Sequence, residues 1–168
     1  MPNPSSKPSK LTHIDAVGAM HMVDVAGKPP SSRRAIAQAR VKLGAAARRA
    51  LASGAAKKGD VLAAARFAGI QAAKKTSELI PLCHPLGLTH ASVDLSLKPW
   101  GVLVTATTET VGPTGVEMEA MTAASVAALT LYDMLKGVER GIVVENVCLL
   151  EKSGGRSGVW RRRRSRAG

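Results

Sequence analysis

The fold class follows from the segment SVDLSLKPWGVLVTATTETVGPTGVEMEAMTAASVAALTLYDMLK (92–136). Its first part, SVDLSL (92–97), alternates polar and apolar residues, as a strand with one buried face does. Pro99-Trp100-Gly101 predicts a turn, and VLVTATTET (102–110) predicts a strand that returns beside the first. These two strands predict an antiparallel sheet.

A long helix follows the two strands. GPTG (112–115) breaks the chain, and we expect the helix to run from there to about 136, where Gly137 is placed to end it. Residues 120–131 contain no charged side chain, which predicts a helix that is buried on most sides. Its charged residues lie only near the two ends, as Glu117, Glu119, Asp133 and Lys136.

The remaining segments add a strand and at least one helix. IVVENVCLL (142–150) predicts a last strand, and Asp60 is placed to cap a helix over about 61–78. Residues 33–53 are ambiguous, because their Ala and Arg content favours a helix whereas the alternation in AIAQARVKL (35–43) fits a strand. The order predicts an α+β fold with an antiparallel sheet and helices packed on one face.

Much of the positive charge lies at the ends of the chain. The 168 residues suit one domain and carry a formal net charge of +12, with 45% hydrophobic and 2% aromatic residues. Two lysines in residues 1–10 and five arginines in 161–168 leave +5 for residues 11–160. We expect a disordered lead over 1–10, a single folded domain over 11–158 and a disordered basic tail over 159–168.

The chain shows no secretory or membrane pattern, which makes a cytoplasmic location the default expectation. The first twelve residues are polar and rich in Pro, Ser and Lys, and no apolar run reaches the roughly 18 residues that a membrane span needs. Two cysteines do not make a disulfide framework.

The two glutamates at the helix start each have two interpretations. Thr114 and Glu117 match a capping box, in which the Glu117 carboxylate accepts from the Thr114 N–H, and a substrate contact by Glu117 is compatible with that role. Glu119 is either a surface carboxylate favoured by the helix dipole or a functional group.

Asp133 and Lys136 are spaced i, i+3 at the helix end. They form either a surface ion pair worth well under about 1 kcal/mol or a base and an acid around a reacting group. Glu119 and Asp133 lie roughly 21 Å apart along the axis and within about 40° of one face. They cannot both touch one reacting atom, so we expect either a long substrate or a site completed by antiparallel packing of two copies.

His84 lies between Pro81 and Pro85, which favour an extended, stiffened backbone. It is either a structural hydrogen-bonding group or a functional imidazole. Cys83 beside it raises the question of a metal, but no paired ligand spacing accompanies the two residues, and we expect no metal site. Lys57 and Lys58 lie just ahead of a predicted helix start. They either contact an anion or form a solvated lysine pair. The surrounding sequence does not match the P-loop pattern.

Four blocks of the sequence together resemble the cyclic pyranopterin monophosphate synthase family of molybdenum cofactor biosynthesis: LTHIDAVGAMHMVDV (11–25), KGDVLAAARFAGIQAAKKTSELIPLCHPL (58–86), GPTGVEMEAMTAASVAALTLYDMLK (112–136) and LLEKSGGRSG (149–158). The resemblance implies a ferredoxin-like fold with a strand over 33–43. It implies a lyase that converts 3′,8-cyclo-7,8-dihydro-GTP to cyclic pyranopterin monophosphate and diphosphate. It further implies dimers that associate into a hexamer, a trimer of dimers with the site at the dimer interface.

The resemblance also implies functional roles for Lys58, His84, Glu117, Glu119, Asp133 and Lys136. Our hypothesis for the division of roles is that Asp133 with Lys58 or Lys136 forms the acid–base set, because opening and reclosing rings needs proton transfers. A triphosphate needs cations, and Arg33 and Lys152 are further candidates for phosphate contacts. A lysine acts in this way near neutral pH only where its surroundings lower its pKa. No tightly bound cofactor is expected, although Mg²⁺ on the substrate triphosphate is compatible with the reaction. The substrate-binding residues would be Leu82, Cys83, His84, Glu117, Met118 and Glu119.

The alternatives are a small basic nucleic-acid-binding protein and an inactive structural oligomer. The charge and the tail favour nucleic acid, but one Phe, one Tyr and two Trp offer few stacking groups, and no aromatic–basic motif of an RNA-binding sheet is present. We therefore expect neither a nucleic-acid partner nor a membrane. Steep weakening by salt would distinguish nucleic-acid binding, and turnover of the cyclised GTP would exclude an inactive oligomer.

Overall fold

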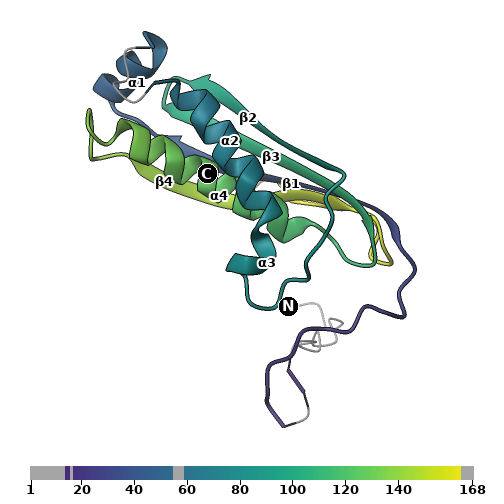
Figure 1. Cartoon of the computed structure of the whole chain (residues 1–168). Coiled ribbons are helices and arrows are strands. Elements are labelled where there is room, and N and C mark those ends of the chain that lie inside the picture. The colour runs from purple at the N-terminus through teal and green to yellow at the C-terminus, as the bar shows by residue number, and fades with distance from the viewer. Residues whose placement is uncertain (1–13, 16, 55–58, 164–168) are drawn as a thin grey trace, which may run out of the picture.

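The computed structural model describes residues 14–15, 17–54 and 59–163. It contains a five-stranded antiparallel sheet in the order β2-β3-β1-β4-β5, with α2 and α4 packed on one face (Figure 1). The α+β fold class predicted from the sequence is confirmed. In chain order the elements are β1 (Ser31–Lys42), α1 (Ala45–Ala52), α2 (Val61–Lys74), α3 (Thr76–Leu79), β2 (His90–Lys98), β3 (Gly101–Gly112), α4 (Glu117–Leu135), β4 (Val143–Ser153) and β5 (Trp160–Arg161).

The ambiguous segment divides into a strand and a helix. Residues 31–42 form β1, the central strand, in which Ala37 pairs with Ala106 on one side and with Leu149 on the other. Alternate β1 residues, including Ala37 and Val41, are fully buried under the helices. Burial of this face outweighs the helix propensity of alanine, which prevails only in α1.

Small side chains let the two long helices approach closely. Gly69 of α2 faces α4, and a Cβ atom at Gly69 would lie 2.8 Å from the Ala123 carbonyl oxygen and 3.1 Å from the Ala127 Cβ. The α4 residues that are buried between α2 and the sheet include Ala120, Ala123, Ala124, Ala127, Ala128, Leu131 and Leu135. The core therefore consists mainly of alanine and valine with a few leucines.

The helix ends agree with the sequence only in part. The Asp60 carboxylate accepts from the Ala63 N–H at 2.9 Å and caps α2, as predicted, although α2 ends at Lys74 and a separate α3 follows. The predicted capping box at α4 is wrong, because the helix begins at Glu117 and its N-cap, Val116, makes no side-chain cap bond. Instead, the buried Thr108 hydroxyl donates to the Val116 carbonyl at 2.9 Å and fixes the helix start to β3.

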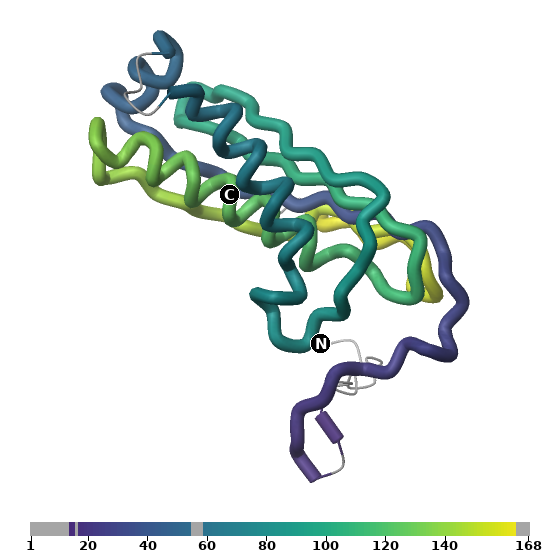
Figure 2. Tube along the Cα trace, in the orientation of Figure 1, coloured from purple at the N-terminus to yellow at the C-terminus, as the bar shows by residue number. Residues whose placement is uncertain are grey.

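Two terminal segments extend the body. Residues 17–30, here called the arm, run away from the sheet, as Figure 2 shows in purple. At the other end, Trp160 and Arg161 pair with Lys152 and Glu151 as β5. The expected tail therefore starts with a short strand, while the predicted lead over 1–10 and residues 164–168 lie outside the described residues. In the described part of the chain, no helix has the length and apolar character of a membrane span.

Candidate active site

All six residues expected to bind substrate line one cavity of about 420 Å³. We call it the acidic cavity. The loop after α3 contributes Leu82, Cys83 and His84, and the first turn of α4 contributes Glu117, Met118 and Glu119. Its volume lies within the roughly 300–1,000 Å³ of small-molecule sites.

His84 joins this cavity to the arm. Its Nε2 atom lies 2.7 Å from the Val23 carbonyl oxygen, which can only accept a hydrogen bond. Nε2 therefore carries the hydrogen, and Nδ1 is the ring nitrogen left for other contacts. The same bond holds the arm at the cavity, where Val23, Val25 and Lys28 complete the lining.

Glu119 is almost completely buried, with 4% of its surface exposed. Burial raises the pKa of the Glu119 carboxyl group above its ordinary value, and the nearby charge of Glu117 raises it further. Burial, and then the charge of Glu119, also raises the pKa of the Cys83 thiol. Cys83 is thus held as a neutral thiol, and Glu119 is suited to exchange a proton with a bound ligand.

The Glu117 side chain folds back over Gly115. A Cβ atom on Gly115 would collide with the Glu117 carboxylate, so a glycine is needed for this arrangement. Within the described residues, the Glu117 carboxylate accepts no hydrogen bond from a backbone N–H, and it lines the cavity beside Glu119.

A second cavity of about 570 Å³ adjoins the first and shares Lys28, Thr114 and Gly115 with it. We call it the basic cavity, because Lys28, Arg33 and Arg156 line it and no acidic residue of the described chain does. Lys152 donates to the hydroxyl of Ser157, another lining residue. The two expected phosphate contacts, Arg33 and Lys152, therefore lie in and beside one basic cavity.

Sequence reasoning missed Lys28 and Arg156. Lys28 precedes Pro29-Pro30, and Arg156 follows two glycines, so both lie at turn signals where a charged side chain has no periodic pattern to mark it. The local signal that was available was the SGGRSG sequence, which predicts a tight loop with an arginine at its tip.

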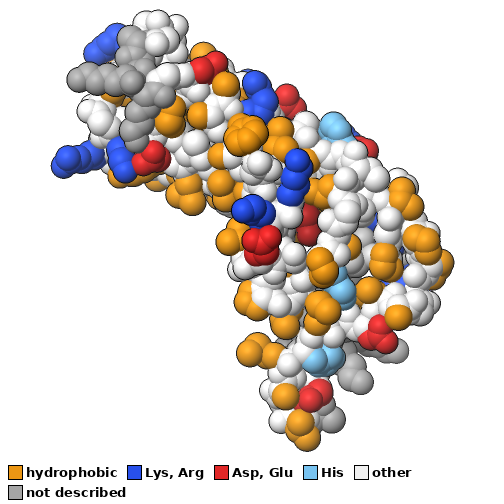
Figure 3. Space-filling model, viewed as in Figure 1, with side chains coloured by type: hydrophobic (Ala, Val, Ile, Leu, Met, Phe, Trp, Pro, Cys, Tyr) orange, Lys and Arg blue, Asp and Glu red, His pale blue; other side chains and the backbone are white. Residues whose placement is uncertain are grey.

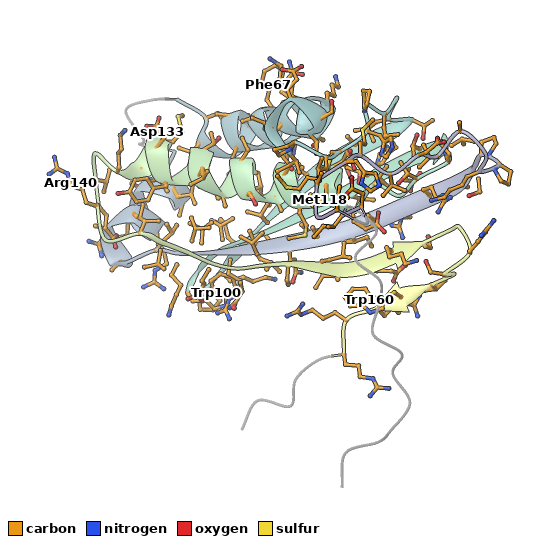
Figure 4. All side chains as sticks on the ribbon, turned by 90° about the horizontal axis from the view of Figure 1, so that it is seen from below. Phe67, Trp100, Met118, Asp133, Arg140 and Trp160 are labelled. Atoms are coloured by element: carbon orange, nitrogen blue, oxygen red, sulfur yellow. The ribbon has the colours of Figure 1, made fainter. Side chains whose placement is uncertain are left out.

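Asp133 and Lys136 lie at the opposite end of α4 from the acidic cavity. Figure 4 shows Asp133 and Met118 far apart along this helix. The Lys136 ammonium contacts the Asp133 carboxylate at 2.6 Å, and about half of each side chain is exposed. Asp133 raises the pKa of Lys136, so in the single chain this lysine is a cation that holds its proton tightly. This shift is opposite to the lowered pKa that an acid–base role near neutral pH requires. Lys58 lies outside the described residues.

Fold and site together define an α+β protein whose adjoining acidic and basic cavities suit a small, negatively charged ligand. The MoaC family profile matches residues 22–155, and this chain belongs to the MoaC family. The family resemblance seen in the four sequence blocks is thereby confirmed.

Two relatives with curated names extend this match over nearly the whole chain. The cyclic pyranopterin monophosphate synthase of Thermomicrobium roseum is 54% identical over 156 residues, which cover 92% of this chain and 94% of the relative. Cyclic pyranopterin monophosphate synthase 1 of Mycobacterium bovis is 58% identical over 153 residues, which cover 90% of each.

Proposed function

We propose that this chain is an enzyme with cyclic pyranopterin monophosphate synthase activity in molybdenum cofactor biosynthesis. It would convert 3′,8-cyclo-7,8-dihydro-GTP to cyclic pyranopterin monophosphate and release diphosphate. The observation that carries this proposal is the identity of 54% and 58% to synthases that it matches over at least 90% of both chains. The adjoining acidic and basic cavities support it, because the substrate joins a heterocycle to a triphosphate.

The reaction has a phosphate step and ring-forming steps. In the phosphate step, a hydroxyl oxygen of the sugar-derived part attacks the α-phosphorus, and the bond from that phosphorus to the bridging oxygen breaks. Diphosphate leaves with the electron pair, and the hydroxyl proton passes to a base. Cations beside the phosphates stabilise the charge that develops on the leaving group.

The arrangement of charges sets the orientation of the substrate in this proposal. The heterocycle lies in the acidic cavity, where Glu117, Glu119 and His84 offer hydrogen-bonding groups. The triphosphate lies in the basic cavity, beside Arg33. Lys28 lines both cavities and is placed for the part of the substrate that joins the two.

The acid–base set would come from a second copy of the chain. Fourteen residues separate Glu119 from Asp133, which is roughly 21 Å along a helix and too far for one reacting centre. Antiparallel packing of two copies would bring Asp133 and Lys136 of one copy to the acidic cavity of the other. Exposed apolar side chains support such packing, among them Val17 and Met20 of the arm and Phe67 of α2, and Figure 3 shows one face on which hydrophobic side chains are open to solvent.

We further propose a hexamer built from three dimers, in the cytoplasm, as the family resemblance implies. Light scattering of the purified protein would then give about six times the chain mass of 17.5 kDa. Among the described residues, no three His, Cys, Asp or Glu side chains converge as metal ligands. In this proposal Mg²⁺ enters only as an ion carried by the substrate phosphates.

The direct test is incubation of the purified protein with 3′,8-cyclo-7,8-dihydro-GTP. Mass spectrometry should detect cyclic pyranopterin monophosphate, and a coupled assay should detect diphosphate in equal amount. Protein denatured by heat is the control. Substrate that stays unchanged in the presence of folded, oligomeric protein would refute the activity.

A further inference from the structure

The loop between β4 and β5 places an arginine at the rim of the basic cavity. Gly154 and Gly155 have φ values of +96° and +69°, a conformation that side chains strongly disfavour. The Gly158 N–H donates to the Gly155 carbonyl at 3.1 Å and closes a four-residue turn, with Arg156 and Ser157 at its two central positions. The turn thus presents Arg156 at its tip.

Two contacts fix this turn against the rest of the cavity. Lys152 of β4 donates to the Ser157 hydroxyl. Gly155 lies against the Arg33 guanidinium so closely that a Cβ atom at Gly155 would collide with it. The tip is therefore held at a defined place over the cavity.

The arginine already expected to bind phosphate is largely engaged in structural contacts. Arg33 donates from Nε to the Gly112 carbonyl at 3.4 Å and from Nη2 to the Pro113 carbonyl at 3.1 Å, and Gly155 covers its Nη1 side. Arg156, in contrast, is exposed and makes no hydrogen bond or ion pair with the part of the chain that the structure describes. Its five N–H groups remain available to an anion.

We infer that Arg156 is a further substrate-binding residue and that it binds the two outer phosphates, which leave as diphosphate. This inference rests on the proposed function. Arg156 lines only the basic cavity, whereas Lys28 lines both cavities. The α-phosphate, which stays with the product, therefore lies toward Lys28, and the β- and γ-phosphates lie toward Arg156. A planar guanidinium group can bind two phosphate oxygens at once.

The test is calorimetric titration of the oligomer with inorganic diphosphate. Arg156→Ala should weaken binding by about tenfold or more, the size expected for a lost charge-assisted contact. The diphosphate affinity of Arg156→Lys should lie between those of wild type and Arg156→Ala. The lysine keeps the positive charge but cannot bind two phosphate oxygens with a planar guanidinium group. In the synthase assay the KM of Arg156→Ala for the triphosphate substrate should rise by a similar factor.

Arg162→Ala is the matched control. It removes the same charge from an exposed side chain that lines neither cavity, and it should leave diphosphate binding unchanged. Equal diphosphate affinity of wild type and Arg156→Ala would overturn the inference. Arg156-dependent diphosphate binding by a protein that does not convert the substrate would instead refute the proposed function and leave the anion site in place.

Discussion

Glu119 is a carboxyl group held where its charge is unfavourable. Its folded-state pKa is raised above the ordinary value of 4.5, first by burial and then by Glu117. The folded protein therefore binds this proton more tightly than the unfolded chain does. It follows that the free energy of unfolding falls as the pH rises from 4.5 through the raised pKa. Retention of such a group in a cavity is typical of functional sites.

Replacing Glu119 by Gln should raise the stability of the protein and lower its synthase activity. The variant should have a higher free energy of unfolding than wild type at pH 7, and this difference should vanish below the ordinary pKa of 4.5. Urea denaturation at a series of pH values measures it, with the exposed Glu78→Gln as control. Synthase activity should fall by about tenfold to a hundredfold, because a charge-assisted contact to the substrate is lost. A Glu119→Gln variant that is less stable than wild type at pH 7 would contradict the assignment.

Only part of this residue-level detail could be predicted from the sequence. Prolines on both sides of His84 predicted a non-helical backbone there, and His84 lies in a loop. The uncharged interior of the long helix predicted that its acidic residues lie near the two ends. The bond from His84 to the Val23 carbonyl could not be predicted, because it joins residues 61 positions apart. The burial of Glu119 depends on tertiary packing in the same way.

At the scale of elements, close packing of α2 on α4 sets the position of the acidic cavity, because the α4 N-terminus carries half of its expected substrate contacts. The contact depends on Gly69, whose absent side chain leaves room for the Ala123 carbonyl and for the Val93 methyl group. In an isolated helix, replacing a glycine by alanine would stabilise the helix by about 1 kcal/mol. Here the added methyl group would overlap backbone and side-chain atoms that cannot all move away.

We therefore predict that Gly69→Ala destabilises the protein by about 1–3 kcal/mol, the usual cost of overpacking, despite the gain in helix propensity. Thermal and urea unfolding measure the change. Gln71→Ala, on the exposed side of the same helix, should change stability by less than about 0.5 kcal/mol. Stabilisation by Gly69→Ala would show that α2 and α4 do not approach as closely as described.

Helices and strands were predicted well where polar and apolar residues recur at a regular spacing. They were predicted poorly where the geometry of a turn sets the end of an element. The β2–β3 hairpin and α4 appear close to their predicted positions. The pattern of residues 33–53 left helix and strand open, and only the family resemblance indicated the strand over 33–43 that the structure shows as β1. The prediction of a capping box at Thr114 and Glu117 was wrong, because the hydrogen bond from Thr108 of β3 to the Val116 carbonyl fixes the start of α4 instead. A motif of four residues could not reveal that tertiary contact.

At the scale of the whole molecule, part of the basic charge is engaged in contacts on the sheet. On the sheet, Arg34 pairs with Glu109 at 3.1 Å and Arg161 with Glu151 at 2.8 Å. Arg40 stacks on the Trp100 ring at 4.2 Å, which occupies one of the two tryptophans. Lys28 and Arg156, which form no ion pair with the described residues, line a cavity instead. A cavity lined by these cations fits a small anionic substrate better than an extended polyanion.

The central claim is that one active site combines the acidic cavity of one copy with Asp133 and Lys136 of another. It can be tested by mixing two variants, Glu119→Gln and Asp133→Asn, each expected to retain about a tenth of wild-type activity or less. Partial unfolding and refolding of an equal mixture produces hybrid dimers, in which one site carries both substitutions and the other carries neither.

We predict that the mixture regains about one quarter of wild-type activity, because half of randomly formed dimers are hybrids and each hybrid has one intact site of two. Mass spectrometry of the intact assembly should confirm that hybrids are present. Hybrid assemblies that stay as inactive as the separate variants would contradict a shared site.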